Sequence, residues 1–258
     1  MTVPRAEGSA WHAQGRHRLH FGERLTLHVL PLIEALNRRC SKVGVGPFFD
    51  PALFPWVGRI ARDWRVIRAE LEPILERRAD LPGFHDILPE IGLISEDRGW
   101  KSFMLTGMGH VAQRNAARCP QTWRLVQQIP GLTCAMFSIL EPGKHLRPHR
   151  GPYNGVLRFH LGLIVPVTNE TVAIRVGEQT RHWNEGEPLI LDDAFEHEAW
   201  NRSDEVRVVL FVDFARPLRF PANLVNRLVL ALAARSPFVL EAYENTRRWE
   251  RAFGGSDG

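Results

Sequence analysis

The sequence has 258 residues, a formal net charge of +4, and 44% hydrophobic against 24% charged residues. This composition is typical of a globular protein of one or two domains and excludes a largely disordered chain. Acidic residues are interspersed with the basic ones throughout, so we expect no nucleic-acid partner. Cys40, Cys119 and Cys134 are too few and too scattered for a disulfide framework, and no CxxC pair indicates a zinc ribbon. We therefore expect reduced thiols and a cytoplasmic location.

The N-terminal part of the chain shows no targeting signal. Its first 23 residues are polar and lack the apolar run of a secretory signal. The most apolar helical stretches, Leu25–Leu36 and Leu224–Ala234, are both shorter than the roughly 20 residues that span a bilayer. We expect no transmembrane anchor and favour core helices for both stretches. Peripheral contact with the inner face of the membrane is the alternative.

The middle of the chain changes from a helical to a strand-like pattern. Between Ile60 and Ala79, apolar residues recur at steps of three and four, which predicts one amphipathic helix that ends before Leu81-Pro82-Gly83. From about Trp100, short apolar runs alternate with Pro, Gly and Asn, which is typical of a β-sandwich or barrel. Helices follow again after residue 220. The pattern predicts a mainly β protein with flanking helices, built as a double-sheet jelly roll.

Two of the predicted strands carry charged side chains on one face. Successive side chains of a strand point to opposite faces. The segment VLRFHLGLI therefore places Leu157 and Phe159 on one face and Arg158 and His160 on the other, and in the last strand Arg207 lies opposite its apolar neighbours. An inward-facing arginine is costly unless it meets an anion. The two arginines thus indicate a dicarboxylate or another polyanion inside the barrel.

Two further histidines lie at strand or loop edges. His149 and His197 are each flanked by polar or turn-forming residues, and their separation suits two ligands on different strands of a barrel. Two imidazoles together with anion-binding arginines suit a ferrous site that binds an oxoacid. A surface or core role is an equally good interpretation of either histidine taken alone. Trp183 is a candidate for lining a substrate groove or for an ordinary buried aromatic residue.

Two long segments resemble a known family. The runs SILEPGKHLRPHRGPYNGVLRFHLGLIVP and HWNEGEPLILDDAFEHEAWNRSDEVRVVLFVDFARP are similar to the core of the aspartyl/asparaginyl β-hydroxylases, over roughly Trp100 to Leu218. Members of that family are iron(II)- and 2-oxoglutarate-dependent oxygenases with a double-stranded β-helix, which is a cupin-like jelly roll. The run HRGPYNGVLRFHLGLIVP is closer to the branch that hydroxylates a lipid A acyl chain than to the animal protein hydroxylases.

The resemblance implies roles for six residues. It implies that His149 and His197 are the catalytic iron ligands. It implies that Arg207 and Ser138 hold the remote carboxylate of 2-oxoglutarate, with Arg158 and His160 at its other end, near the metal. Most enzymes that use this cofactor pair carry a carboxylate two residues after the first histidine. Here that position is Gly151, and the family is known for this omission.

The implied function is a hydroxylase that uses Fe(II), with 2-oxoglutarate and O2 as cosubstrates. A lipid A-type fatty acyl chain is the favoured substrate, and the alternatives are Asp or Asn residues of a peptide or a related small molecule. A non-catalytic jelly-roll binding module and a zinc-dependent cupin-like hydrolase or isomerase are the other classes, and neither has a use for all six residues. The sequence makes no prediction of the oligomeric state.

The resemblance also suggests a division of the chain. We expect an N-terminal helical or flexible flank over residues 1–45. Residues 46–220 would form the double-stranded β-helix oxygenase domain with its leading helix. Residues 221–258 would add C-terminal helices and a tail.

Overall fold

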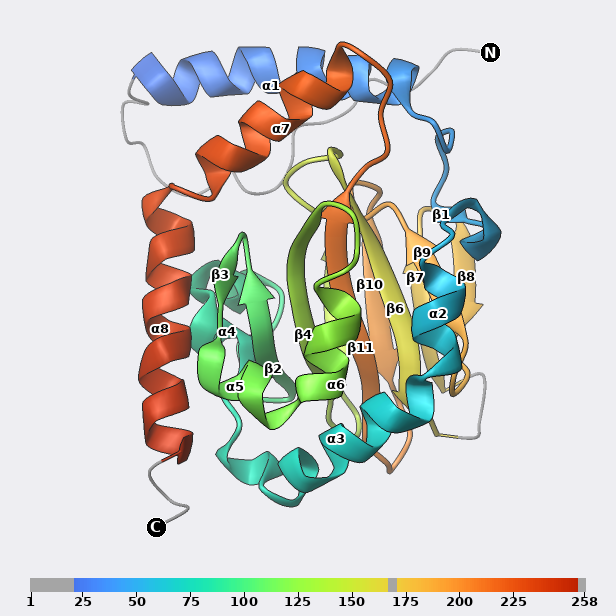
Figure 1. Ribbon diagram of the computed structural model, residues 1–258, viewed down its shortest axis with the longest axis vertical. Coiled ribbons are helices and arrows are strands. Elements are labelled where there is room, and N and C mark those ends of the chain that lie inside the picture. Colours follow the sequence, from blue (N-terminus) through green and yellow to red (C-terminus); the bar gives the residue numbers. More distant parts are fainter. Residues whose placement is uncertain (1–20, 167–170, 255–258) are drawn as a thin grey trace.

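The computed structural model describes residues 21–166 and 171–254. Within them, a seven-stranded and a four-stranded sheet lie face to face, with helices over the larger sheet and at one end of both (Figure 1). The strands are β1 Phe48–Phe49, β2 Trp100–Gly107, β3 His110–Val111, β4 Leu132–Leu140, β5 His145–His149, β6 Val156–Ile164, β7 Val172–Val176, β8 Gln179–His182, β9 Pro188–Leu191, β10 His197–Asn201 and β11 Arg207–Ala215. The helices are α1 Phe21–Cys40, α2 Val57–Arg62, α3 Trp64–Glu76, α4 Phe84–Ile87, α5 Gln113–Arg118, α6 Pro120–Val126, α7 Ala222–Ala233 and α8 Pro237–Gly254. The described residues also form three short 3-10 helices: η2 Pro51–Leu53, η3 Arg78–Asp80 and η4 Pro89–Leu93.

The strand order is that of a double-stranded β-helix. The larger sheet runs β1-β9-β6-β11-β4-β2-β3 and the smaller one β5-β10-β7-β8, and every pair is antiparallel. From β4 to β11 the chain passes back and forth between the two sheets. The predicted fold class, mainly β with flanking helices in a jelly roll, is confirmed.

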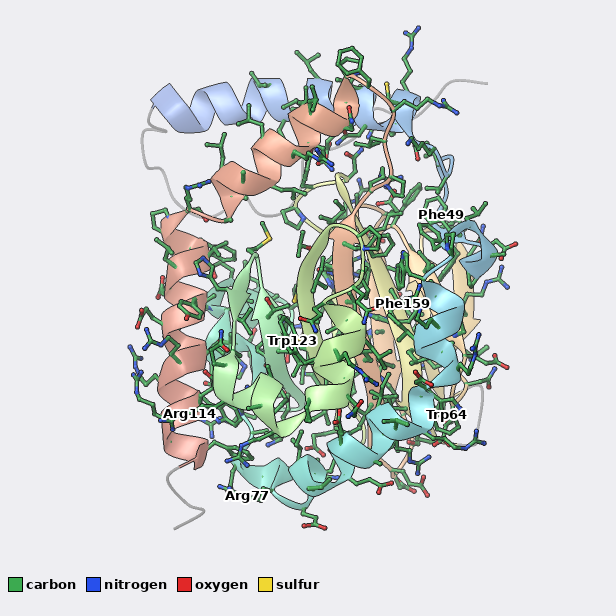
Figure 2. All side chains as sticks on the ribbon, in the orientation of Figure 1. Phe49, Trp64, Arg77, Arg114, Trp123 and Phe159 are labelled. Atoms are coloured by element: carbon green, nitrogen blue, oxygen red, sulfur yellow. The ribbon has the colours of Figure 1, made fainter. Side chains whose placement is uncertain are left out.

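The larger sheet has an apolar core on each of its faces. Leu157 and Phe159 of β6 and Val208 of β11 point outward and pack with the helices that cover this sheet; Figure 2 shows Phe159 between β6 and α2. Val209 and Phe211 of β11 point inward, toward the smaller sheet. The predicted alternation is therefore confirmed. It leaves Arg158, His160 and Arg207 on the face that looks into the barrel.

The predicted single helix from Ile60 to Ala79 is wrong in its extent. It is two helices, because Asp63 leaves helical geometry with ψ of 15° between α2 and α3. The second helix ends at Glu76, and η3 follows before the extended Leu81. The buried stripe itself was predicted correctly, since Ile67 and Leu71 have no exposed surface.

The two most apolar helices lie at the surface, which corrects the prediction that they are core helices. Leu224, Leu228 and Leu232 of α7 are 52%, 61% and 62% exposed, and Leu32 of α1 is 71% exposed. An apolar run alone does not say whether a stripe faces a core or the outside. In the part of the chain that the structure describes, no helix combines the length and apolar character needed to cross a bilayer.

The division of the chain into residues 1–45, 46–220 and 221–258 stays a prediction. Residues 1–20, the larger part of the predicted N-terminal flank, lie outside the described residues. The start of the C-terminal segment coincides with the turn into α7.

Candidate active site

His149 and His197 meet at the edge where β5 and β10 pair. His149 is the last residue of β5, His197 is the first of β10, and the two are partners in the antiparallel register. Their ring centroids are 4.1 Å apart. Burial lowers the pKa of His149 to about 4 and that of His197 well below its usual value, so both imidazoles are neutral near pH 7.

Backbone carbonyls determine which nitrogen of each histidine is protonated. Nδ1 of His149 lies 2.7 Å from the carbonyl oxygen of Arg147, and Nδ1 of His197 lies 3.0 Å from that of Phe195. A carbonyl only accepts hydrogen bonds, so each Nδ1 carries the proton and each Nε2 keeps a lone pair. Nε2 of His197 is buried and has no partner. Both rings are thus held as a metal site requires, with Nε2 available as the ligand atom.

His160 has the opposite tautomer. Trp183 donates its indole N–H to Nδ1 of His160 at 3.3 Å. Burial lowers the pKa of His160 well below its usual value, so the neutral ring carries its proton on Nε2. That N–H is buried without an acceptor. It is a donor for an oxygen atom of a ligand inside the barrel.

Arg207 is a buried cation without a carboxylate partner. Its side chain is 2% exposed, and no carboxylate of the described residues contacts it. Its guanidinium lies 4.5 Å from the centre of the Trp183 ring, its Nη1 is 3.4 Å from the Ser138 carbonyl oxygen, and its Nε has no partner. Burial lowers the pKa of Arg207 to about 9, because no negative charge compensates it. An anion is the missing partner.

Ser138 and Trp183 connect these groups. Ser138 lies on β4 and is 3% exposed, and its Oγ accepts a hydrogen bond from the Trp100 indole at 3.0 Å. The Ser138 hydroxyl hydrogen is therefore available to a ligand. Trp183 contacts both His160 and Arg207, so it is a buried structural aromatic residue that orients two site residues. The sequence contains no signal for the Trp100 contact, because it depends on the register of β2 against β4.

Arg158 differs from Arg207 because two carboxylates of the chain already pair with it. Arg158 donates from Nε to Asp213 at 2.8 Å and forms an ion pair with Asp193 at 2.9 Å. It also lies 4.2 Å above the Phe211 ring. Burial raises the pKa of Asp193, against the opposing effect of Arg158. Of these two arginines, Arg207 is the one that lacks a carboxylate partner among the described residues.

Gly151 leaves the space that Asp193 occupies. A Cβ atom at Gly151 would lie 2.3 Å from Oδ2 of Asp193, and the Gly151 N–H donates to the Asp193 carbonyl oxygen at 2.7 Å. A carboxylate side chain therefore has no room two residues after His149. Among the residues that the structure describes, no group of three or more His, Cys, Asp and Glu side chains could hold a metal ion. A metal at this site would be held by the two histidines alone.

We expect Gly151→Ala to destabilise the protein by about 1–3 kcal/mol, because the added Cβ displaces the carboxylate that Arg158 holds. Gly58→Ala is the control, since a Cβ there meets nothing within 4 Å and the position is helical. Urea denaturation of both variants measures the difference. Equal stability of the two would show that Asp193 is not fixed against Gly151.

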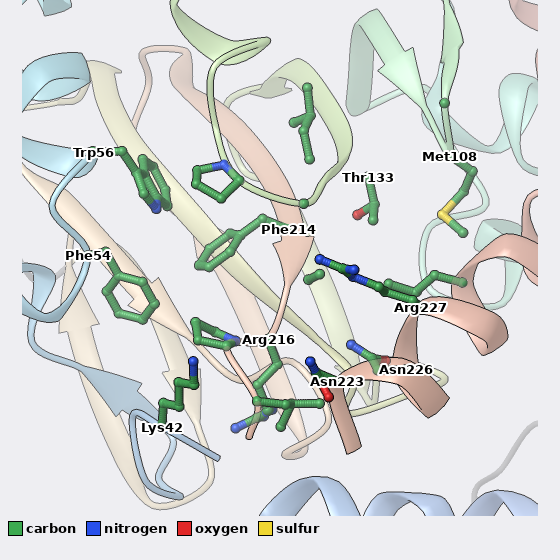
Figure 3. Close-up of a pocket in the computed structure, with 18 of the residues that line it drawn as sticks. Lys42, Phe54, Trp56, Met108, Thr133, Phe214, Arg216, Asn223, Asn226 and Arg227 are labelled. Carbon is green, nitrogen blue, oxygen red and sulfur yellow. The ribbon is translucent and has the colours of Figure 1, made fainter. Parts of the chain in front are cut away.

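One hollow of the described structure lies away from the histidine pair. A groove of about 740 Å³ runs between α7 and the ends of β4 and β11, and Phe54, Trp56, Phe214 and Arg227 are among the residues that line it (Figure 3). It contains none of the six predicted site residues. Nε2 of His160, Nε2 of His197 and Nε of Arg207, which are all buried without a hydrogen-bond partner, lie outside this groove.

Comparison with known proteins identifies related sequences. The model of the aspartyl/asparaginyl β-hydroxylase family matches residues 61–217. The ornithine lipid ester-linked acyl 2-hydroxylase of Rhizobium tropici is 53% identical over 230 residues, which cover 89% of this chain and 82% of that protein. The human aspartyl/asparaginyl β-hydroxylase is 35% identical over 166 residues, which cover 62% of this chain but 21% of that enzyme.

Solved structures show weaker similarity. The cupin domain of Schizosaccharomyces pombe Cnp3 is 10% identical with a TM-score of 0.34, covering 52% of this chain and 72% of that one. A predicted oxalate decarboxylase of Thermotoga maritima is 16% identical with a TM-score of 0.31, covering 47% and 89%. Because these scores are low, the fold assignment rests on the strand order and pairing.

Proposed function

The chain belongs to the aspartyl/asparaginyl β-hydroxylase family, and we propose that it is an iron(II)- and 2-oxoglutarate-dependent hydroxylase of a lipid acyl chain. The observation that carries this proposal is the buried Arg207, which has no carboxylate partner, together with two neutral histidines that have Nε2 available. A zinc hydrolase has no use for such a cation. A degenerate binding module would not preserve the complete set of six residues.

The free atoms of the site fit iron and a 2-oxo acid. His149 and His197 would hold the metal through Nε2, in the tautomers that their backbone carbonyls impose. Arg207 and the Ser138 hydroxyl would bind the remote carboxylate by charge-assisted and neutral hydrogen bonds. The Nε2–H of His160 would donate to an oxygen at the metal end. Arg158 would hold the side chains of Asp193 and Asp213 in place at that end.

When bound, iron(II) with 2-oxoglutarate and O2 supplies the chemistry that converts a C–H bond to C–OH and 2-oxoglutarate to succinate and CO2. The chain positions these reactants. The Trp183 contacts fix His160 and Arg207 relative to one another. The apolar inner core, which includes Val209 and Phe211, excludes water from the space between His160 and Arg207.

The acyl chain of an ornithine lipid is the substrate that the bacterial relative favours. The Rhizobium tropici enzyme, which is named for this lipid, is 53% identical over most of both chains. We propose this substrate in preference to lipid A, which stays a prediction from the sequence. The second candidate, Asp or Asn residues of a peptide, is favoured by the human relative, although the chain spans only 21% of that enzyme's length. We place the protein in the cytoplasm, with peripheral contact at the inner face of the membrane.

The test is turnover by the purified protein in detergent micelles that contain ornithine lipid. With ferrous iron, 2-oxoglutarate and O2, we expect succinate to form in step with a gain of one oxygen atom on the lipid, measured by mass spectrometry. Chelation should abolish turnover, and added iron but not zinc should restore it. If succinate forms in step with hydroxylation of an Asp- or Asn-containing peptide and no lipid gains oxygen, the second candidate is the substrate.

His197→Ala should lower succinate formation by about 10³-fold or more, because it removes one of two metal ligands. Bound iron, measured by elemental analysis, should fall with it. His145→Ala is the matched control, since His145 lies on the same strand as His149 but is exposed and pairs with Glu198. If His197→Ala retains iron and turnover, the histidine pair is not the metal site.

A further inference from the structure

Two helices carry apolar side chains that no part of the described structure covers. On α7, Leu224, Leu228 and Leu232 repeat every four residues and are more than half exposed, and Phe220 just before the helix is 75% exposed. On α1, Leu32 is 71% exposed. A stripe of large apolar side chains on one helix face is an unusual feature of a solvated surface and marks an interaction site. We call these five residues the apolar face.

In both helices, the side opposite the apolar face is turned toward the barrel. Asn37 of α1 donates to the Tyr153 hydroxyl at 2.9 Å and to the Asn154 side chain at 3.1 Å. Asn226 of α7 donates to the Gly155 carbonyl oxygen at 2.8 Å. Because one loop binds both helices, their buried sides meet there and their apolar sides point away from the barrel.

That loop is the segment that leaves His149. It runs from residue 150 to residue 155, directly between β5 and β6. The helices α1 and α7 therefore lie side by side across the end of the barrel at which the histidine pair sits (Figure 1). Whatever contacts the apolar face is placed at the same end of the molecule as the candidate active site.

The segment that contains α7 carries charge of one sign. Residues 214–240 contain no Asp or Glu, and they include four arginines. Arg219, Arg227 and Arg235 are exposed. Exposed leucines next to arginines, without acidic residues, are the composition of helices that lie in the interface of an anionic bilayer.

The groove beside α7 continues this surface inward. Arg227 extends into it from α7, and Phe54, Trp56 and Phe214 line the other side (Figure 3). A cation at the side of an aromatic and apolar channel is chemically suited to an anionic amphiphile. Part of a lipid molecule at the apolar face can therefore lie in this groove.

We propose that α1 and α7 form a docking surface for an anionic lipid bilayer, with the apolar face inserted among the acyl chains and the arginines at the headgroups. The inference deepens the proposed function, on which its biological meaning rests, because it brings the end of the barrel that holds the histidine pair to the phase that contains the acyl chains. A second copy of the chain is a poorer occupant. Two such faces would bring arginines together, and residues 214–240 offer no carboxylate to pair them.

Cosedimentation with vesicles tests the docking surface. We expect the full chain to bind vesicles of equal parts phosphatidylglycerol and phosphatidylcholine about tenfold or more tightly than vesicles of phosphatidylcholine alone. The triple variant Leu224→Ser/Leu228→Ser/Leu232→Ser should bind the anionic vesicles about tenfold or more weakly. Arg219→Gln/Arg227→Gln should remove most of the preference for anionic vesicles.

Matched controls separate docking from misfolding. Leu93→Ser changes a leucine with the same 61% exposure as Leu228, but on η4, and it should bind vesicles like the parent protein. Arg62→Gln/Arg124→Gln removes two exposed arginines elsewhere and should keep the anionic preference. All variants should unfold at the parent temperature, because the changed side chains are exposed.

Three results would overturn the docking surface. One is no binding of the parent protein to anionic vesicles, and another is parent-like binding by the triple serine variant. The third is a stable dimer in sedimentation equilibrium that the serine variant dissociates, which would assign the apolar face to a second copy. Hydroxylation in detergent micelles is measured in parallel. Vesicle binding without hydroxylation would refute the proposed function and leave docking intact, whereas hydroxylation without vesicle binding would do the reverse.

Discussion

Replacing Arg207 by Gln is expected to raise the apparent KM for 2-oxoglutarate by about 100-fold or more. Arg207 is the buried cation for which no carboxylate of the described residues is a partner. A charge-assisted contact to a ligand carboxylate in such a place contributes about 3 kcal/mol. Direct titration of the iron-loaded protein with 2-oxoglutarate should show the same loss. Iron binding should be unchanged, because Arg207 contacts neither His149 nor His197.

Replacing Arg207 should weaken cosubstrate binding but should increase the stability of the protein. Arg207→Met should raise the free energy of unfolding of the metal-free protein by about 1–3 kcal/mol, because it removes an uncompensated buried charge. Arg158→Met is the matched control on the neighbouring strand. It would leave Asp193 and Asp213 without their cation and should cost about 3–5 kcal/mol. Destabilisation by both changes to the same extent would mean that Arg207 has a partner in the free protein.

Much of the site could be predicted from the period of the strands. Because side chains alternate along a strand, the sequences of β6 and β11 alone place Arg158, His160 and Arg207 inside the barrel. The two polar strands that carry His149 and His197 were harder to find. HLRPH and HEAWN lack an apolar alternation, so the sequence marked their histidines as edge residues but did not identify β5 and β10 as strands.

The partners of the inward-facing charges could not be predicted. Asp213 meets Arg158 because β11 pairs with β6 in one particular register, and Asp193 reaches the same guanidinium from the turn after β9. Such contacts depend on strand pairing over long sequence distances. The same holds for the surface position of α7, since its apolar stripe fits a buried helix equally well. Local pattern predicts which face is apolar and leaves open what covers it.

Asp192→Ala is expected to be among the most destabilising single changes in the protein, at about 3–5 kcal/mol. Arg216 forms a short ion pair with Asp192, and the Arg216 side chain is completely buried. Arg216 also donates from Nε to the Asn154 carbonyl oxygen at 2.6 Å. Without Asp192, the cation would stay buried with that carbonyl as its hydrogen-bond acceptor. Urea denaturation measures the loss, and Asp192→Leu/Arg216→Met should recover most of it.

The exposed pair of Glu96 and Arg147, with a separation of 3.0 Å and side chains 71% and 60% exposed, is the control. Glu96→Gln should change stability by less than about 0.5 kcal/mol. Asp192 also has a functional consequence, because the pair joins the loop after His149 to the turn before His197. In Asp192→Asn, which keeps the shape of the side chain, we expect iron affinity to fall by about 10–100-fold. If Asp192→Asn loses stability but binds iron like the parent protein, the ion pair supports the fold without positioning the histidines.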